Sequence, residues 1–442
     1  MLPLGSQLCN ALGVARGKHK HCGIQVASLS LDPEERFKMD NLLLAGLARS
    51  SVYKTHGMAR VFCGVDQDRV QHQEPNLAED LRRLDAGVWI TIPDEHGGMR
   101  RVRLRAWVLL VAADMLAANS LLPFMESTGA HLFCRQCDCD SRAAYANAAY
   151  SFVRPPAPEP GAAKSARPSG PSLRSWPMLK ALLERCRSLS GKHLKKEFTE
   201  NGINKRVFAF DPTYVPHVTP TDIAPQDILH LFPDGILRSE CAWLFYILIK
   251  LGLDLRAVRH AVRACTSLPA DVRVPDLHDD LKKGVKGGKP SAKAVMRMTG
   301  SQMMHFALHS QQILDPLLTP QMKAHPAWIC WIKLVELFAL VIQVRLEVSD
   351  VERIDNLVQE HSQLFDNVAE YEGLKRPKHH FAKHVAMDAW RYGPPRGYWC
   401  FGFEGFNKVI KKGASLSNWK SETVSIMKYW SLRSGHALKA RL

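Results

Sequence analysis

The chain has 442 residues, 46% of them hydrophobic, and a formal net charge of +16 at pH 7. This apolar content excludes a disordered tail and suffices for one large core or several smaller ones. The basic charge predicts a polyanionic partner, and because no lipid-anchor motif is visible we expect nucleic acid rather than a membrane, with a merely solubilising basic surface as the alternative.

Cysteine usage bears on the compartment. The 11 cysteines are mostly scattered, and no secretory signal peptide stands at the start of the sequence. We therefore expect a reducing compartment and, with DNA as the partner, the nucleus. Two apolar stretches, 243–253 and 327–344, resemble membrane spans. The first is too short and the second contains Lys333 and Glu336, so both are predicted to be buried helices.

The first 115 residues are predicted to contain strands and turns. Residues 22–29 and 87–92 alternate between apolar and polar side chains, which is typical of strands with one buried face. The sequence Asp-Pro-Glu-Glu at 32–35 favours the start of a helix that leads into 39–47, because proline is tolerated in a first turn.

An apolar run at 103–113 ends abruptly at Asp114. A buried strand that ends in a carboxylate is a common way to form an α/β active site, so we predict a strand here. The alternative is that the run begins a helix that continues through 115–118 and leaves Asp114 merely exposed.

A proline-, alanine- and serine-rich segment at 154–177 cannot pack a core, which predicts a linker. Beyond it the apolar residues recur with the helical period. Helices are predicted at 178–189, 226–251, 255–265, 292–314, 326–348 and 351–371. We expect four parts: a mixed N-terminal part (1–150), the linker (151–177), a helical domain (178–373) and a C-terminal part (374–442).

Two pairs of metal-binding residue types stand far apart in the sequence. Cys134 and Cys137 form a Cys-x2-Cys arrangement, and His379 precedes His384 by five residues. Two thiolates from a tight knuckle and two imidazoles complete a closed, tetrahedral zinc site, with Cys139 as a reserve thiol. The alternatives are a coincidental cysteine pair and a solvated, basic histidine loop.

Each pair is accompanied by a carboxylate at the same separation. Asp114 precedes Cys134 by twenty residues (134 − 114), and Glu404 follows His384 by twenty (404 − 384). Zinc would thus hold together two segments that each carry an acidic residue. Carboxylates bind Mg²⁺ or Mn²⁺, and such ions promote in-line phosphoryl transfer, so Asp114 and Glu404 are candidate catalytic residues.

Asp227 and His230 form an Asp-x2-His arrangement that places both side chains on one face of a helix. Both are further catalytic candidates. The alternative, which spacing alone favours, is that Asp227 caps a helix and His230 is incidental, and Asp234 is equally ambiguous.

Two groups of lysines are candidates for contacts with the DNA backbone. One lies in a glycine- and lysine-rich loop, where ammonium groups can follow phosphates with little steric demand, although a solvated loop is the alternative. The other follows Glu404 at helical spacing. The candidate residues are Lys282, Lys283, Lys286, Lys289, Lys408, Lys411 and Lys412.

Several short blocks occur in a fixed order along nearly the whole chain. They are Leu2-Pro3-Leu4-Gly5-Ser6, Lys18-His19-Lys20, Ala113-Asp114, Pro123-Phe124-Met125-Glu126-Ser127, Phe133-Cys134-Arg135-Gln136-Cys137, Gly202-Ile203-Asn204-Lys205-Arg206, Asp227-Ile228-Leu229-His230, Lys378-His379-His380, Gly393-Pro394 and Phe403-Glu404. In this order they resemble the transposase-domain proteins of CACTA/Chapaev-like and hAT-like DNA transposons, whose pattern is shared in outline with the recombination-activating recombinase.

The resemblance implies an α/β (α+β) fold, in which an RNase H-like core is interrupted by a large helical insertion between its second and third acidic residues, Asp114 and Glu404. It also implies that zinc clamps the ends of the insertion and that Asp227 and His230 support the scissile DNA. The ancestral reaction would be metal-dependent DNA strand cleavage and transfer by a DDE-type transposase, working as a homo-oligomer. A non-catalytic, transposase-derived DNA-binding or assembly protein is the alternative.

The chain departs from the family pattern at several positions. The family's first aspartate stands just before the Leu-Gly-Ser segment, where this chain starts at Met1, so we expect a truncated or inactive copy without that carboxylate. Pro123, Gly402 and Asn407 stand where a glycine, an arginine and a histidine are usual. None of these departures affects the predicted zinc ligands.

Overall fold

The protein is described from a computed structural model, which is mostly helical with a small sheet. The described residues are 4–9, 21–28, 42–49, 61, 65–66, 69–70, 77–94, 97–141, 171–206, 208–269, 285–286, 289–416 and 421–439. The chain divides into two compact units. Unit 1 comprises Met1–Asp138, Leu173–Pro225 and Tyr398–Leu442, and unit 2 comprises Cys139–Ser172 and Gln226–Gly397.

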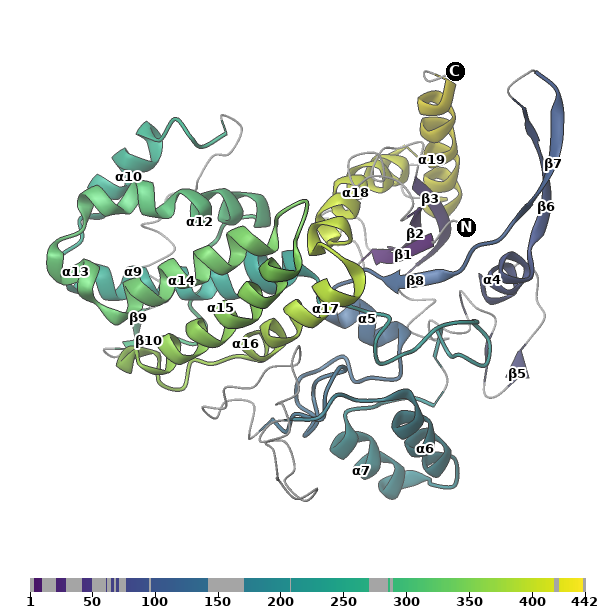
Figure 1. The fold of residues 1–442 in the computed structure, drawn as a ribbon, viewed down its shortest axis with the longest axis horizontal. Helices are drawn as coiled ribbons and strands as arrows, with labels where there is room; N and C mark the ends of the chain where they lie inside the picture. The colour runs from purple at the N-terminus through teal and green to yellow at the C-terminus, as the bar shows by residue number, and fades with distance from the viewer. Residues whose placement is uncertain are drawn as a thin grey trace. The chain divides into compact units, whose positions relative to one another are not determined.

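Unit 1 contains a four-stranded sheet with the strand order β3-β2-β1-β8 (Figure 1). Its strands are β1 (Leu4–Cys9), β2 (His21–Ser28), β3 (Leu42–Arg49) and β8 (Val108–Val111). The first three pair antiparallel in chain order, whereas β8 pairs parallel with β1. The strand predicted at 22–29 is confirmed by β2.

The segment predicted to be helical at 39–47 forms strand β3 from Leu42 onwards, so that prediction is wrong. β3 pairs with β2 along its length, with Leu42 opposite Ala27. Its sequence, Leu-Leu-Leu-Ala-Gly-Leu-Ala-Arg, suits either a helix or a strand locally, and pairing with a neighbouring strand decides between them. The helix start predicted at 32–35 lies outside the described residues.

A basic hairpin precedes β8 in unit 1. Helix α4 (Leu77–Ala86) leads into β6 (Val88–Pro93), which pairs antiparallel with β7 (Met99–Leu104) and confirms the strand predicted at 87–92. Trp89 and Arg101 lie on one face, and the guanidinium of Arg101 stands 5.1 Å from the centre of the Trp89 ring. Two shorter strands, β4 (Val65–Asp66) and β5 (Arg69–Val70), form a separate pair.

Asp114 lies at a junction between a strand and a helix. Strand β8 is buried at three of its four positions, and the chain leaves it three residues before Asp114. The Asp114 carboxylate then accepts the N–H of Ala117 at 2.6 Å and caps helix α5 (Met115–Leu121). The predicted strand is therefore present at 108–111, and the helix of the alternative begins only after Asp114.

Helices α6 (Trp176–Arg187) and α7 (Gly191–Asn201) follow in unit 1, and α6 confirms the helix predicted at 178–189. The chain leaves α7 through Gly202, whose φ of 66° lies in the left-handed region. A Cβ at Gly202 would stand 1.8 Å from the carbonyl oxygen of Leu132. Both the backbone conformation and the close approach therefore require glycine here.

Replacing Gly202 by alanine tests this requirement. We expect Gly202→Ala to lower the free energy of unfolding by about 3 kcal/mol or more, because strain and a backbone clash add. Gly191 is a matched control, since its φ is 53° but a Cβ there meets no atom within 4 Å, so Gly191→Ala should cost about 1 kcal/mol. Urea unfolding followed by circular dichroism measures both, and equal losses would contradict the packing argument.

Unit 2 is helical, and its first helix begins at Ile228, so the helical domain predicted from residue 178 is divided between the units. Its helices are α8 (Ile228–Leu231), η2 (Phe232–Ile236), α9 (Leu237–Lys250), α10 (Leu255–Ala264), α12 (Gly300–Leu314), η3 (Asp315–Leu317), α13 (Pro320–Ala324), α14 (Pro326–Val341), α15 (Val348–Asp366), η4 (Ala369–Tyr371), α16 (Pro377–Phe381), η5 (Ala382–His384), α17 (Val385–Tyr392) and η6 (Pro395–Gly397). Helices α14 and α15 lie side by side (Figure 1). Large side chains such as Trp243, Trp331 and Phe338 are fully buried.

Helix boundaries in unit 2 follow local capping. The helix predicted at 255–265 is confirmed by α10, and that at 351–371 by α15 and η4. The helix predicted at 292–314 begins only at Gly300, because Thr299 and Gln302 form a capping box in which each side chain accepts the other's backbone N–H. The helix predicted at 326–348 ends at Val341.

The helix predicted at 226–251 is interrupted by a π-helical turn, η2, between α8 and α9. The backbone of Asp234 leaves helical geometry within this turn. Lys378 donates from Nζ to the carbonyl oxygens of His230 at 2.5 Å and Asp234 at 3.1 Å. Helix α16 is thereby attached to the irregular turn.

Several predicted features cannot be followed in side-chain detail. Residues 151–170 of the linker, Lys282 and Lys283 lie outside the described residues. The backbone around Lys286 and Lys289 forms two short paired strands, β9 (Val285–Lys286) and β10 (Lys289–Pro290), without described lysine side chains.

The last two helices, α18 (Cys400–Ser415) and α19 (Glu422–Lys439), belong to unit 1 and pack against each other, with α18 contacting β1 and α19 contacting β3. Among the helices that the structure describes, none is both long and apolar enough to cross a bilayer.

Candidate metal centre

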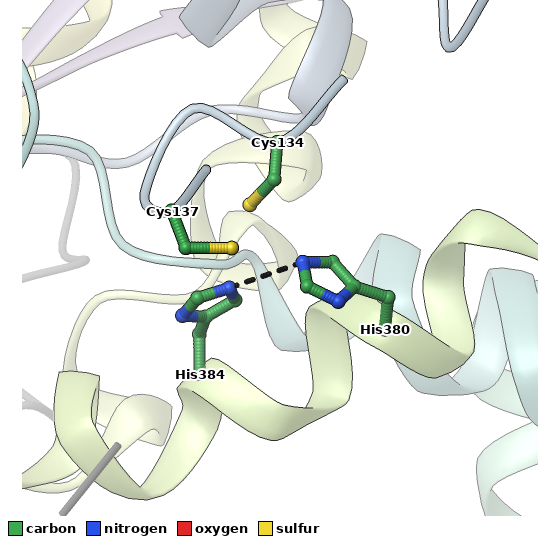
Figure 2. A group of neighbouring side chains, drawn as sticks. All are labelled: Cys134, Cys137, His380 and His384. Carbon is green, nitrogen blue, oxygen red and sulfur yellow. Dashed lines mark hydrogen bonds between the residues drawn. The ribbon is translucent and has the colours of Figure 1, made fainter. Parts of the chain in front are cut away.

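Two cysteines and two histidines form one buried group (Figure 2). The sulfur atoms of Cys134 and Cys137 and one ring nitrogen each of His380 and His384 all lie within 4.8 Å of one another. Each of these side chains is at most 1% exposed. Two thiols and two imidazoles are the ligand set of a closed structural zinc site, so these residues fit zinc.

The contact between the imidazoles fits a shared ion. Nε2 of His384 lies 3.3 Å from Nε2 of His380, and the ring planes are inclined at 78°. With zinc–nitrogen bonds of about 2.0–2.1 Å, two nitrogens of a tetrahedral site stand about 3.3–3.4 Å apart. Figure 2 shows both rings projecting from one helical segment toward the cysteine loop. A cation placed there would be bound by the lone pairs of both imidazoles.

One predicted ligand is corrected, because His380 belongs to the group and His379 does not. Residues four apart in a helix share a face, which suits His380 and His384, whereas His379 stands five residues before His384. The ring of His379 is engaged elsewhere. Its Nε2 lies 3.1 Å from Oε1 of Glu240, and its Nδ1 accepts the backbone N–H of Arg376 at 2.9 Å.

Two buried arginines fix the cysteine loop. The guanidinium of Arg174 donates to the carbonyl oxygens of Cys137 at 3.0 Å and Leu132 at 2.8 Å. Arg135, between the cysteines, donates to the carbonyl oxygens of Ala224 at 2.9 Å and Pro225 at 2.8 Å. Burial lowers the pKa of Arg174, and the nearby Cys134 and Cys137 oppose this shift. The loop is therefore held in shape by its own unit.

A backbone hydrogen bond also favours metal binding by the cysteine thiols. The N–H of Gln136 donates to the sulfur of Cys134 at 3.4 Å. A backbone donor at a sulfur stabilises the thiolate form that binds a metal. The fold thus favours the charge state that zinc requires. Cys139, the predicted reserve thiol, is buried but lies outside the group.

Asp227 and His230 are brought together as the sequence spacing predicts. Asp227 caps α8 and also accepts from Nδ1 of His230 at 2.5 Å. Asp227 therefore caps the helix, as the alternative predicted, and also pairs with His230. Asp227 is 7% exposed, whereas the His230 side chain is 25% exposed. A carboxylate at Nδ1 orients the ring and makes Nε2 the nitrogen available for proton transfer or binding.

The predicted carboxylates Asp114 and Glu404 are both partly buried in unit 1. Neither joins a group of three or more metal-binding side chains among the described residues. Glu404 lies on α18, where Lys411 and Lys412 are exposed and the side chain of Lys408 is outside the description. Binding of Mg²⁺ or Mn²⁺ at Asp114 and Glu404 stays a prediction.

Two functional residues of this region were missed from the sequence. Arg174 stands at the end of the proline-rich segment, and Glu240 lies inside an apolar helical stretch. The sequence did indicate that Glu240 has a partner. A carboxylate within a run as apolar as α9 must be paired when it is buried. Arg174 had none, because its partners are backbone carbonyls that no sequence pattern marks.

Comparison with protein-family models and with curated proteins finds no match to this chain.

Substitution of the two adjacent histidines tests the corrected ligand set. We expect His380→Gln to remove about one zinc ion per chain, because a glutamine cannot replace a zinc-binding imidazole. His379→Gln is the matched control, since an amide can still donate to Glu240. Elemental analysis of the purified full chain measures zinc. Loss of this ion in His379→Gln but not in His380→Gln would restore the original assignment.

Proposed function

We propose that this chain is a transposase-like DNA-binding protein with a structural zinc ion held by Cys134, Cys137, His380 and His384. The buried Cys2His2 group carries the proposal, because it brings together the Cys-Arg-x-Cys and Lys-His-His blocks on which the resemblance depends. Zinc bound by ligands that are distant in sequence converts binding energy into folding energy.

The sheet of unit 1 supports an RNase H-like core. Three antiparallel strands are followed by a fourth, β8, that pairs parallel with β1. The chain reaches Asp114 three residues after the carboxyl end of β8, the end of a strand near which active-site carboxylates of α/β folds commonly lie. In this proposal the helical unit is the insertion between Asp114 and Glu404.

Charge supports DNA as the partner. The chain has 59 basic and 43 acidic side chains, and phosphate contacts from such an excess supply most of the affinity for nucleic acid. Lys411 and Lys412 are exposed on α18, and Arg100 and Arg101 are exposed on β7. A two-stranded basic ribbon such as β6–β7 is one of the elements that proteins place in a DNA groove.

Binding to double-stranded DNA should be mainly electrostatic. With about six phosphate contacts, we expect the affinity to fall roughly 10³-fold between about 50 and 200 mM salt, measured by fluorescence anisotropy. The double variant Lys411→Glu, Lys412→Glu should weaken binding about tenfold and flatten the salt dependence. The matched control is Lys192→Glu with Lys195→Glu on α7, which changes the net charge equally. An affinity independent of salt, or equal losses in both double variants, would count against the proposal.

DNA strand cleavage distinguishes an active transposase from a non-catalytic, transposase-derived protein. An enzyme would nick DNA in the presence of Mg²⁺, and Glu404→Gln would abolish nicking while leaving DNA binding intact. A transposase-derived binding or assembly protein would bind DNA with the same salt dependence and leave it uncut. A gel assay of supercoiled plasmid with the full chain and with Glu404→Gln distinguishes them.

A further inference from the structure

Unit 2 contains a second buried group of metal-binding side chains. Glu240 lies on α9, Cys330 on α14 and His361 on α15. A carboxylate oxygen, the sulfur and a ring nitrogen of these residues lie within 4.8 Å of one another. The three residues are at most 6% exposed. A carboxylate buried to this degree requires a partner of opposite charge or strong hydrogen bonds.

The contacts are centred on the Glu240 carboxylate. Its Oε2 lies 3.0 Å from Nε2 of His361 and 3.9 Å from Sγ of Cys330. Its Oε1 lies 3.1 Å from Nε2 of His379. One carboxylate oxygen therefore meets an imidazole and a thiol together, and the other is oriented by a second imidazole.

The chemistry of this group suits a cation. The Cys330 thiol donates to Oε2 of the Glu240 carboxylate at 3.9 Å. A divalent ion that replaces the thiol proton would be neutralised by the carboxylate and the thiolate together.

The distances are close to those of a zinc site. Ligand atoms bound at about 2.0–2.3 Å in a tetrahedron stand about 3.3–3.8 Å apart, and the contacts to Oε2 are slightly shorter, at 3.0 Å, and slightly longer, at 3.9 Å. Nitrogen, sulfur and carboxylate oxygen are together the donors that zinc accepts, whereas Mg²⁺ and Ca²⁺ prefer oxygen alone.

A small cavity adjoins the group. It has a volume of about 10 Å³ and is lined by His361, His379 and Phe365 among others, which is close to the space that one water molecule needs. We propose that Glu240, Cys330 and His361 bind a second zinc ion in unit 2, with water as the fourth ligand and His379 positioning the carboxylate. This ion would connect helices α9, α14 and α15.

A metal-free network is the competing explanation. Two imidazoles that donate to Glu240 account for the burial of the carboxylate without any ion. In such a network the Cys330 thiol adds long hydrogen bonds to Oε2 of Glu240 at 3.9 Å and to the carbonyl oxygen of His361 at 4.0 Å. Both histidines keep their contacts with Glu240 when the thiol is removed. Zinc binding does require the thiolate. Cys330 therefore distinguishes the two explanations.

The test is zinc content, by elemental analysis, of the full chain purified without chelators. We expect about two zinc ions per chain for the unsubstituted protein and about one for Cys330→Ala. The control is Cys241→Ala, which removes an equally buried cysteine of unit 2 that belongs to no metal-binding group, and it should keep both ions. Equal zinc content in Cys330→Ala and Cys241→Ala would overturn the proposal.

Cobalt substitution separates this site from the Cys2His2 site. We expect thiolate-to-cobalt charge-transfer absorption to fall by about one third in Cys330→Ala and by about two thirds in Cys137→Ala, in proportion to the thiolates each site contributes. Cobalt absorption lost entirely in Cys137→Ala and unchanged in Cys330→Ala would overturn the second site while leaving the first. The reverse pattern would keep the second site and remove the first, and with it the main support for the transposase-like function.

Discussion

One constraint on the fold is the burial of four metal-binding side chains in a single group. Cys137 and His380 are 243 residues apart (380 − 137), yet their side chains lie within 4.8 Å of each other in a group that is almost fully buried. Without an ion, burial leaves polar atoms at a high desolvation cost. With an ion, the same contact closes a very long loop and so removes freedom from the unfolded chain. The cysteine loop is held in shape by hydrogen bonds and so already presents two of the four ligands of such a site.

Helix α16 connects the two buried groups through consecutive residues. His379 contacts the Glu240 carboxylate, whereas His380 contacts the Cys2His2 group. Successive side chains of a helix point about 100° apart, so one short helix can serve two polar centres on different sides. The start of this helix is fixed by a proline and by the Arg376 capping contact. A change in the rotation of the helix would disturb both centres at once.

Local patterns predicted those elements whose signals are local. The alternation at 22–29 and the helical period at 255–265 predicted the right elements, and the cysteine spacing identified the two thiols of the buried Cys2His2 group. The segment at 39–47 failed because its pairing partner β2 decides its conformation. Whether His379 or His380 joins Cys134 and Cys137 depends on which face of the helix is turned toward the cysteines. The sequence of the helix alone does not contain this information. The role of Glu240 was missed for the same reason, since its partners come from three other helices.

The kink within η2 has a consequence for how such a protein can diverge. The backbone leaves helical geometry at Asp234, directly after Pro233, and a proline inside a helix is a usual cause of such a kink. Lys378 donates to the carbonyl oxygens of His230 and Asp234, before and at the kink. An insertion or deletion in this segment would move these two acceptors relative to Lys378 and so remove the place where α16 is attached. The irregularity thus constrains the length of this segment.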